Sequence, residues 1–259
     1  MITVPWQERT LLLFDEKKLE ILREANVLVA GLGGVGGYAA EMLCRAGVGK
    51  MTIIDGDRIQ DSNRNRQLLA LTSTVGKRKA DLMRDRLWDI NPQLTLTVID
   101  EFIRDERTNE ILEESFDYVV DAIDTLSPKI FLIRQAMVRA LPLVSSMGAG
   151  GKTDPTKVFV ADFAETYQCN LARMLRKRLK NLGVRTGFKT VFSPEIIDEA
   201  AMQPVTDEPN KKTTVGTISY MPAVFGCVMA SVVIRELLGI EIDLVRRPCR
   251  QKSGPRLDV

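Results

Sequence analysis

The stretch VAGLGGVGG, residues 29–37, follows a short apolar run and precedes a segment with helical spacing. Its Gly31, Gly33 and Gly36 satisfy the pattern G-x-G-x-x-G. Glycines at this spacing allow a tight strand-to-helix turn and close approach of the backbone to a phosphate, and the helix N-terminus adds N–H groups. We expect these three glycines and Gly34 to face the phosphates of a nucleotide. Taken alone, the stretch favours a nicotinamide dinucleotide.

Strand and helix signals alternate on both sides of this turn. Short apolar runs predict buried strands at residues 26–31, 50–55, 95–100, 118–124 and 142–148. Helical spacing predicts helices at residues 38–49, with a stop at Gly47, and at residues 75–92. Ser127 and Pro128 predict another helix, with a serine N-cap and proline at its first position. The alternation predicts an α/β fold with a Rossmann-like, doubly wound, mostly parallel sheet and a C-terminal extension.

The pattern changes after Gly151. The sequence there predicts a strand at 157–163, an amphipathic helix at 170–183, a mobile polar loop at 203–215 and a long helix at 221–238. The apolar stretch within that last helix is too short to span a bilayer, so we expect a buried helix. We predict one domain over residues 1–240, made of a nucleotide-binding half at about 20–150 and a substrate half at 151–240, and a basic, flexible tail at 241–259.

The composition is that of a globular protein that needs neither disulfides nor zinc. Of the 259 residues, 27 % are charged and 45 % are hydrophobic, and the net charge is +2, so any basic surface must be local. The four cysteines form no C-x-x-C pair and the chain has no histidine, which argues against structural zinc and removes the usual general base. The first ten residues lack the apolar core of a secretory signal. We therefore expect a cytoplasmic protein without a membrane span.

Polar residues after the predicted strands identify the nucleotide. Asp55 ends the second strand, where an acid binds ribose hydroxyls. Asn63 and Arg66 lie in the following loop, and Lys79 is expected one turn into the next helix. Asp124 ends the fourth strand, so that all five positions face the carboxyl edge of the sheet. A redox dinucleotide needs no such cations or acid, whereas ATP cleavage needs cations at the phosphates and a carboxylate for Mg²⁺.

The motifs GLGGVGG, IIDGD, SNRNRQ, VGKRKAD and VVDAIDT occur in this order between residues 9 and 150. In this combination the chain resembles the adenylating enzymes of the ThiF/MoeB/HesA superfamily, relatives of ubiquitin-activating enzymes. The resemblance implies a ribose contact for Asp55 and a Mg²⁺ contact for Asp124. It also implies contacts to the ATP phosphates for Asn63, Arg66 and Lys79.

The segment ERTLLL, residues 8–13, resembles the N-terminal segment of the same superfamily. An arginine there reaches the ATP of the partner subunit, which implies that catalytic role for Arg9 and a homodimer. Asp15 stands where the superfamily has a glycine, so we expect the local turn to differ. Asp57 either binds nucleotide or shapes its loop, and Asp121 is expected only to hydrogen-bond a neighbouring turn.

The second half of the chain indicates which carboxylate is activated. Residues 143–184, 190–195 and 216–237 closely resemble the tRNA threonylcarbamoyladenosine dehydratases. The resemblance implies ATP-dependent adenylation of the threonyl carboxylate of N6-threonylcarbamoyladenosine in the tRNA anticodon loop. The carbamoyl group then attacks the acyl carbon, AMP leaves, and a ring closes to give cyclic threonylcarbamoyladenosine. Ring closure is intramolecular, so the reaction needs no nucleophile from the protein.

Other functions stay open on the sequence alone. The main alternative is adenylation of the C-terminal glycine of a ubiquitin-like sulfur-carrier protein, although such branches often carry paired C-x-x-C motifs that this chain lacks. A sulfur-relay protein that docks on the chain is another partner that the sequence leaves open. A nucleotide-gated RNA-binding scaffold with a decayed site, or a dehydrogenase, agrees less well with Arg66, Lys79 and Asp124.

Seven basic residues and no acidic one lie between residues 169 and 190. On an amphipathic helix they predict either a solvated face or contacts to RNA phosphates. The residues expected to contact tRNA are Arg173, Arg176, Lys177 and Lys180. Phe188 is the one aromatic residue of this run, so base stacking is not predicted.

The cysteines are not expected to take part in the reaction. Cys169 lies where related enzymes can have a thioester cysteine, but a structural thiol is the simpler interpretation. Cys44 and Cys227 lie on apolar helices and are expected in the core, and Cys249 lies in the tail.

Overall fold

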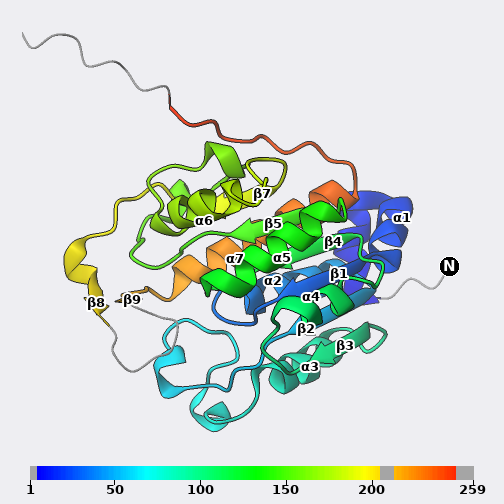
Figure 1. Ribbon diagram of the computed structural model, residues 1–259. Helices are drawn as coiled ribbons and strands as arrows, with labels where there is room; N and C mark the ends of the chain where they lie inside the picture. The colour runs from blue at the N-terminus through cyan, green and yellow to red at the C-terminus, as the bar shows by residue number, and fades with distance from the viewer. Residues whose placement is uncertain (1–4, 205–212, 249–259) are drawn as a thin grey trace, which may run out of the picture.

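The computed structural model describes residues 5–204 and 213–248. Seven strands form one sheet in the order β3-β2-β1-β4-β5-β7-β6 (Figure 1), and every neighbouring pair is parallel except β6 and β7. The strands are β1 Asn26–Ala30, β2 Lys50–Ile54, β3 Thr95–Ile99, β4 Tyr118–Asp121, β5 Leu143–Ser146, β6 Phe159–Asp162 and β7 Lys189–Phe192. The predicted Rossmann-like, mostly parallel sheet is confirmed.

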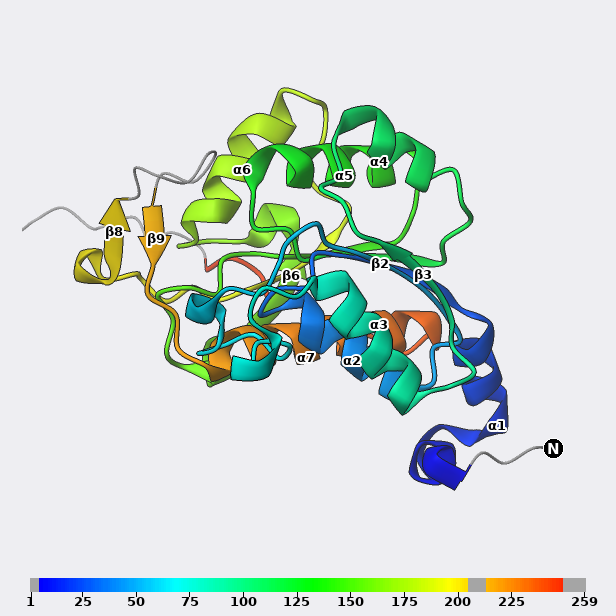
Figure 2. The ribbon, with the colours of Figure 1, turned by 90° about the horizontal axis from the view of Figure 1, so that it is seen from below.

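Helices cover both faces of this sheet. α2, α3 and α7 lie on one face, α4, α5 and α6 lie on the other, and α1 lies beyond one end (Figure 2). The helices are α1 Glu8–Glu24, α2 Gly36–Ala46, α3 Lys79–Ile90, α4 Asp105–Ile111, α5 Leu126–Val138, α6 Asn170–Lys180 and α7 Tyr220–Leu237. The strand order reverses between β1 and β4, and a doubly wound sheet binds its ligand at the carboxyl ends of such a strand pair.

The central strand β1 shows why the sheet needs two helical layers. Its side chains alternate between faces, so Val27 and Val29 pack with α2, α3 and α7, while Leu28 and Ala30 pack with α5 and neighbouring elements. All four are 0 % exposed. A parallel strand that is buried on both faces has a continuous apolar run in its sequence, as residues 27–30 do.

α7 is the buried helix predicted from the apolar stretch near the C-terminus. Gly226 lets it cross α2 closely, because a Cβ there would lie 2.4 Å from the Val35 carbonyl oxygen. Within the part of the chain that the structure describes, α7 is the one helix long and apolar enough to cross a membrane. Its Met221 and Phe225 are completely buried against the sheet, as expected of a core helix.

The start of α5 differs from the prediction. The helix begins at Leu126 with Thr125 as its N-cap, so Ser127 and Pro128 lie inside the first turn instead of at its boundary. Pro128 is tolerated there because the first N–H groups of a helix have no partner within the helix. The fourth strand also ends earlier than predicted, at Asp121, so Asp124 lies in the loop between β4 and α5.

Two further helix predictions need correction. α6 ends at Lys180, and Gly183 then adopts a left-handed φ of 82°, which turns the chain away. Leu182, which lies within the predicted helix but beyond the observed one, is therefore 43 % exposed. Cys44 is buried as predicted, but Cys227 is exposed because it lies on the outer side of α7.

Parts of two segments predicted to be mobile are ordered. β8 Met202–Pro204 and β9 Thr213–Val215 form an antiparallel pair at the two ends of the predicted polar loop. In the predicted tail, Val245 N donates to the Val160 oxygen at 2.9 Å, and Arg247 N donates to Glu165 Oε2 at 2.9 Å. These bonds hold residues 241–248 beside β6. The rest of the tail, including Cys249, lies outside the described residues.

Asp15 interrupts α1 with φ 66° and ψ 170°, a conformation almost restricted to glycine. A glycine-type turn is thus formed despite the aspartate, whose Oδ1 accepts from Lys18 N at 3.0 Å and caps the next turn. Asp15→Gly is expected to raise the free energy of unfolding by about 1 kcal/mol, because relief of backbone strain outweighs loss of the cap. Urea unfolding measures the change, with Asp15→Asn as the control that keeps an acceptor and gains nothing. A less stable glycine variant would contradict the expectation.

Glu41 joins α2 to α3 through a buried carboxylate. It is 5 % exposed and accepts from Arg45 Nε at 2.8 Å and from Arg86 of α3. Burial by itself raises the pKa of Glu41, but the hydrogen bonds and charges of Arg86 and Arg45 outweigh it and place the pKa below its ordinary value. The ion pair therefore favours the folded state when the carboxylate is charged.

Glu41→Gln is expected to lower the free energy of unfolding by about 1–3 kcal/mol near neutral pH, because charge-assisted hydrogen bonds are lost. Since the folded pKa lies below the unfolded value of about 4.3, this stabilisation is complete above that value and is lost as the pH falls through the folded pKa. Urea unfolding across the acidic range should therefore show the two proteins converging. A constant difference down to about pH 3 would contradict this origin of the stabilisation.

Candidate functional site

The predicted glycine turn lies at the carboxyl end of β1, against the end of β4. Gly31 has φ 91°, and a Cβ there would lie 2.8 Å from the Ala122 carbonyl oxygen. A Cβ on Gly36 would lie 1.7 Å from the Gly31 carbonyl oxygen. Both positions therefore require glycine. α2 begins at Gly36, so the N-terminal N–H groups of the helix lie at this turn, as an anion site requires.

Asp55 directly follows β2 and is tied to the glycine turn. Its Oδ2 accepts from Leu32 N at 2.7 Å, and its Oδ1 accepts from Asp57 N at 2.8 Å. Burial raises the pKa of the Asp55 carboxyl, and the charge of Lys79 and the two backbone N–H groups oppose that effect. The carboxylate thus lies where the ribose contact was predicted, with backbone donors that fix its orientation.

Lys79 is the first residue of α3, not one turn into the helix as predicted. The helix begins there because Lys79 N donates to the Asp57 carbonyl oxygen at 3.0 Å in the preceding loop. The Lys79 side chain is 5 % exposed, and its Nζ lies 2.7 Å from Asp57 Oδ2. Of the two roles left open for Asp57, its contacts therefore support shaping the loop and holding Lys79.

The loop after β2 brings Arg66 to the glycine turn. A Cβ on Gly34 would lie 3.5 Å from Arg66 Cγ and 3.0 Å from the Pro222 Cβ of α7. The Arg66 guanidinium donates hydrogen bonds within its own loop. Asn63 is buried, and its side-chain oxygen closes the turn of the same loop. Asn63 thus supports the loop, while Arg66 lies beside the expected phosphate position.

Gln67 is a site residue that the sequence analysis missed. Its Oε1 is buried and has no hydrogen-bond partner within residues 5–204 and 213–248. Its Nε2 lies 3.8 Å from the position of a Cβ on Gly33. Buried polar atoms are normally paired, so this unpaired acceptor beside the glycine turn is available to a water molecule or to a donor group of a ligand. The available signal was its position directly after Arg66 in the SNRNRQ motif.

The two acids near the end of β4 have different environments. Asp121 is 0 % exposed; its Oδ2 lies 2.8 Å from Lys129 Nζ and accepts from Ser145 Oγ at 2.6 Å. Its Oδ1 also accepts from Ile123 N, the neighbouring-turn contact that was predicted. Asp124 is exposed and joins none of the ion pairs of the described chain. Asp124 is therefore the available carboxylate, and Asp121 is structural.

The buried ion pair also holds the loop that carries Asp124. Lys129 Nζ donates to the Ile123 carbonyl oxygen at 3.0 Å, one residue before Asp124. The same loop contacts Gly31 through the Ala122 carbonyl group. Lys129 was not predicted, because its position on α5 has no sequence pattern that distinguishes a buried lysine from a surface lysine.

Arg9 does not join the other predicted residues within one chain. It lies exposed on α1, and this helix lies at the end of the molecule opposite β8 and β9 (Figure 2). α1 leads into the amino end of β1, whereas the glycine turn follows the carboxyl end of that strand. A role of Arg9 at the nucleotide would therefore require a second subunit.

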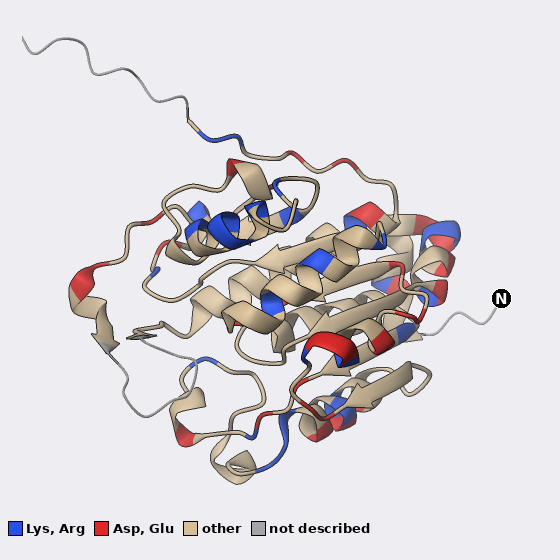
Figure 3. Cartoon of the chain, in the orientation of Figure 1, with Lys and Arg blue, Asp and Glu red and all other residues tan. Residues whose placement is uncertain are grey.

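Several lysine and arginine residues lie on α6 (Figure 3). Arg173, Lys177 and Lys180 are exposed, as contacts to RNA would require. Arg176 departs from the prediction: it is half-buried and donates to the Thr166 carbonyl oxygen at 3.0 Å. The apolar side of α6 packs on the sheet, and Arg176 lies at the edge of that side. Arg176 therefore fixes the helix instead of presenting a cation.

Cys169 immediately precedes α6 and is 5 % exposed. A buried thiol supports the structural interpretation over a thioester role.

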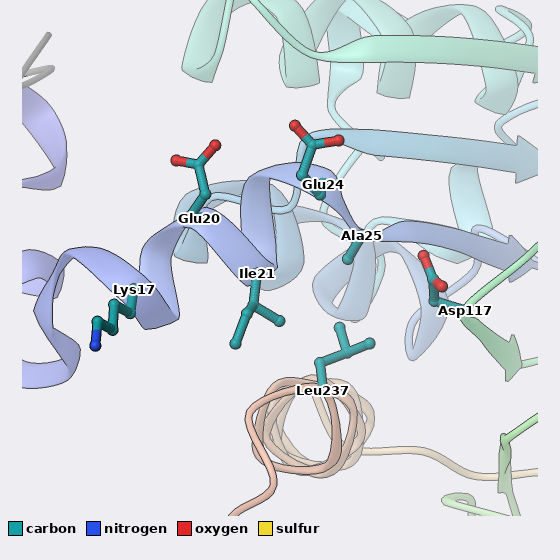
Figure 4. A pocket seen from close by; sticks show the side chains of 7 residues that line it. All are labelled: Lys17, Glu20, Ile21, Glu24, Ala25, Asp117 and Leu237. Atoms are coloured by element: carbon teal, nitrogen blue, oxygen red, sulfur yellow. The ribbon is translucent and has the colours of Figure 1, made fainter. Parts of the chain in front are cut away.

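A cavity of about 700 Å³ lies away from the glycine turn, between α1 and the end of α7 (Figure 4). Ile21 and Leu237 point toward each other across it, and its lining also includes Lys17 and three acids, Glu20, Glu24 and Asp117. This acidic lining does not suit an anionic nucleotide, and none of the predicted site residues contributes to it. The cavity is therefore not the candidate active site.

Comparison with known proteins agrees with the arrangement at the carboxyl edge of the sheet. The model of the ThiF family matches residues 7–254. The chain belongs to the ThiF family. A tRNA threonylcarbamoyladenosine dehydratase of Bacillus subtilis is 38 % identical to this ThiF-family chain over 246 residues, which cover 92 % of the chain and 97 % of that protein.

A solved structure extends this similarity to the fold. The crystal structure of Escherichia coli tRNA N6-threonylcarbamoyladenosine dehydratase, TcdA, in complex with ATP matches with a TM-score of 0.83 and 36 % identity. The match covers 92 % of the ThiF-family chain and 97 % of TcdA. By contrast, the E. coli molybdopterin-synthase adenylyltransferase is 33 % identical over 156 residues, 60 % of this chain and 62 % of that enzyme. The predicted resemblance to the superfamily and to the dehydratases is confirmed.

Proposed function

We propose that the protein uses ATP to adenylate the threonyl carboxylate of N6-threonylcarbamoyladenosine in tRNA and releases cyclic threonylcarbamoyladenosine. The observation that carries the proposal is the convergence of the glycine turn, Asp55, Arg66, Lys79 and Asp124 at one sheet edge. Similarity to dehydratases over 92 % of the chain supports the choice of substrate.

The residues present fit ATP. Gly33 and Gly34 leave room for close approach of phosphates, and the unpaired Gln67 amide oxygen would accept from an N–H or O–H group of the nucleotide. Asp55 supplies ribose acceptors, and Lys79 supplies a cation that a phosphate would share with Asp57. A buried lysine that is already paired and oriented needs little rearrangement when the phosphate arrives.

Asp124 would hold Mg²⁺. The described residues contain no cluster of three or more acidic or cysteine side chains that would form a complete metal cage. Mg²⁺ in nucleotide sites is typically held by one or two carboxylates together with phosphates and water, so a single exposed carboxylate is sufficient. The ion would neutralise charge on the phosphates during their cleavage.

The chemistry divides between the substrate and the protein. The threonyl carboxylate attacks the α-phosphorus of ATP and displaces pyrophosphate; the carbamoyl group then attacks the acyl carbon, and AMP leaves as the ring closes. Lys79 and Arg66 would neutralise the charge that develops on the phosphates. The second step is intramolecular, so correct orientation replaces a protein nucleophile, in agreement with the absence of histidine.

Incubation with ATP, Mg²⁺ and threonylcarbamoylated tRNA tests the proposal. We expect the modified nucleoside to lose the mass of one water and ATP to yield AMP and pyrophosphate. The observation in support of the alternative, adenylation of a sulfur-carrier protein, is the similarity to molybdopterin-synthase adenylyltransferase over 60 % of the chain. ATP–pyrophosphate exchange that responds to such a carrier and not to the modified tRNA would support the alternative and exclude the dehydratase.

Asp124→Asn is expected to raise by at least about tenfold the Mg²⁺ concentration needed for half-maximal exchange, because a charged ligand is lost. Titration of Mg²⁺ at saturating ATP measures this. Asp61→Asn, which removes an exposed acid from the neighbouring loop, is the control and should leave the titration unchanged. An unaltered Mg²⁺ requirement in Asp124→Asn would make the metal assignment wrong.

We further propose a cytoplasmic homodimer in which Arg9 serves the partner subunit's ATP. Leu12 and Leu13 on α1 are 82 % and 72 % exposed, and burial of such side chains would favour association. Mixing Arg9→Ala subunits with Lys79→Met subunits tests this role, because only a mixed dimer would contain a site with both residues. Activity that does not recover on mixing would contradict action across the interface.

The exposed cations of α6, Arg173, Lys177 and Lys180, are proposed to contact tRNA phosphates. Such contacts would make tRNA affinity fall as the salt concentration rises. A sulfur-relay protein could also dock on the chain without preventing the proposed reaction on tRNA. A pull-down with a persulfide carrier, in the presence and absence of tRNA, would detect this binding.

A further inference from the structure

A groove of about 390 Å³ lies between α5, the end of α6 and the start of α4, separate from the nucleotide residues. We call it the α5–α6 groove. Its lining includes Ser127, Phe131 and Arg134 from α5, and Arg178, Asn181 and Leu182 from α6 and the turn after it. The helices that line it, α4, α5 and α6, lie on one face of the sheet (Figure 2), and α6 carries the exposed cations described above.

The groove begins next to the candidate active site. Ser127 is three residues after Asp124, in the first turn of α5. Phe131 and Arg134 follow at spacings of four and three residues, so all three side chains lie on one face of the helix. Two helical turns separate Ser127 from Arg134, which gives the groove a length of about 10 Å along α5. A molecule whose reacting end lies at Asp124 can thus extend into the groove.

The charge of the groove favours an anionic ligand. Arg134 and Arg178 come from different helices and join none of the ion pairs formed by the described residues. Asp105, at the start of α4, is the one acid in the lining. Uncompensated guanidinium groups on two sides of a groove are well suited to phosphate oxygens.

The groove also offers an aromatic surface. Phe131 is half-buried in the lining, beside the buried Ile130 and the exposed Leu182. Unpaired RNA bases stack on aromatic side chains while arginines contact their phosphates. Asn181 and Ser127 add polar groups that can hydrogen-bond a base edge or a ribose. Aromatic, cationic and amide groups therefore occur together in one groove.

We propose that the α5–α6 groove binds an unpaired nucleotide of the RNA substrate that neighbours the reacting adenosine. Phe131 stacks on its base, and Arg134 and Arg178 contact the adjoining phosphates. The proposal rests on tRNA being the substrate. It adds a base-stacking contact to the phosphate contacts of α6 and fixes the direction in which the RNA strand leaves the active site.

Affinity for threonylcarbamoylated tRNA, measured over a range of salt concentrations, tests the proposal. Phe131→Leu is expected to weaken binding about tenfold without changing the salt dependence, because a base contact and no charge is lost. Phe131→Tyr, which keeps the ring, should restore the affinity. Arg134→Gln and Arg178→Gln should each lower the slope of log affinity against log salt by about 0.7, the value for one phosphate of a single strand.

Arg84→Gln is the control, since it removes a half-buried cation, paired with Asp81 and Asp85, from α3 on the opposite face of the sheet. ATP affinity should be unchanged in all these variants, which shows that the fold and nucleotide site are intact. Wild-type tRNA affinity in Phe131→Leu and in both arginine variants would overturn the proposal. Weaker binding of an acidic carrier protein, with tRNA binding unchanged, would instead make the groove a protein-docking surface. Wild-type protein that does not bind or convert the tRNA would refute the proposed function itself.

Discussion

Replacing Lys129 with methionine is expected to lower the free energy of unfolding by about 3–5 kcal/mol. Lys129 and Asp121 are both 0 % exposed, and their charged groups lie 2.8 Å apart. Methionine fills a similar volume but leaves the Asp121 carboxylate buried without an opposite charge, with the Ser145 hydroxyl as a remaining donor. Desolvation of an unpaired charge outweighs any gain in apolar packing. Equilibrium unfolding in urea measures the difference.

Two controls separate charge from packing. The double variant Lys129→Met with Asp121→Asn removes both charges and is expected to recover more than half of the lost stability. Lys157→Met breaks an exposed pair with Asp154 and should leave stability nearly unchanged. If the single variant at Lys129 were as stable as the wild type, the buried pair would contribute nothing to the fold.

Replacing Lys79 with methionine is expected to lower the rate of ATP–pyrophosphate exchange by about 10²–10³-fold. Lys79 is a buried cation at the carboxyl edge of the sheet, and in the proposed site its removal would leave developing negative charge on the phosphates without that cation. The fold should tolerate the change, because the remaining Asp57 carboxylate is 51 % exposed and can be solvated. Steady-state exchange, with tRNA affinity measured in parallel, gives the result.

Lys77→Met is the matched control, because Lys77 lies two residues earlier and is exposed. Its exchange rate should remain within a few-fold of the wild-type rate. A Lys79 variant that kept nearly full exchange, with its fold intact, would move the phosphate-neutralising role to another cation, with Arg66 the first candidate.

The nucleotide half could be predicted from sequence because its requirements are local. The turn requires glycine at residues 31 and 36, because a Cβ at either position would clash with neighbouring backbone. Asp55 follows a strand that its apolar run predicts clearly. Helix termini were less predictable. α5 begins one residue before Ser127, because contacts from Asp121 and Lys129 to the preceding loop decide where the helix starts.

Long-range contacts explain what the sequence could not show. In the sequence, Arg176 cannot be distinguished from the exposed basic residues around it on α6. Its hydrogen bond to the Thr166 carbonyl oxygen is visible only in the folded structure. Phe131 and Arg178 are distant in the chain, so residues 169–190 alone do not show that an aromatic side chain lies beside the basic helix. Gln67 was missed because an unpaired amide becomes visible only when its neighbours are in place.

The ordered segment at residues 241–248 has a practical consequence for protein engineering. Arg247 donates to the Ala164 carbonyl oxygen at 3.1 Å and also to the Thr166 carbonyl oxygen that receives Arg176. A chain cut at residue 240 would retain every residue of the nucleotide site but lose this clamp on the base of α6. Truncation at this point is therefore expected to disturb the proposed tRNA contacts of α6 while sparing the proposed nucleotide site, which would allow the two to be separated in one molecule.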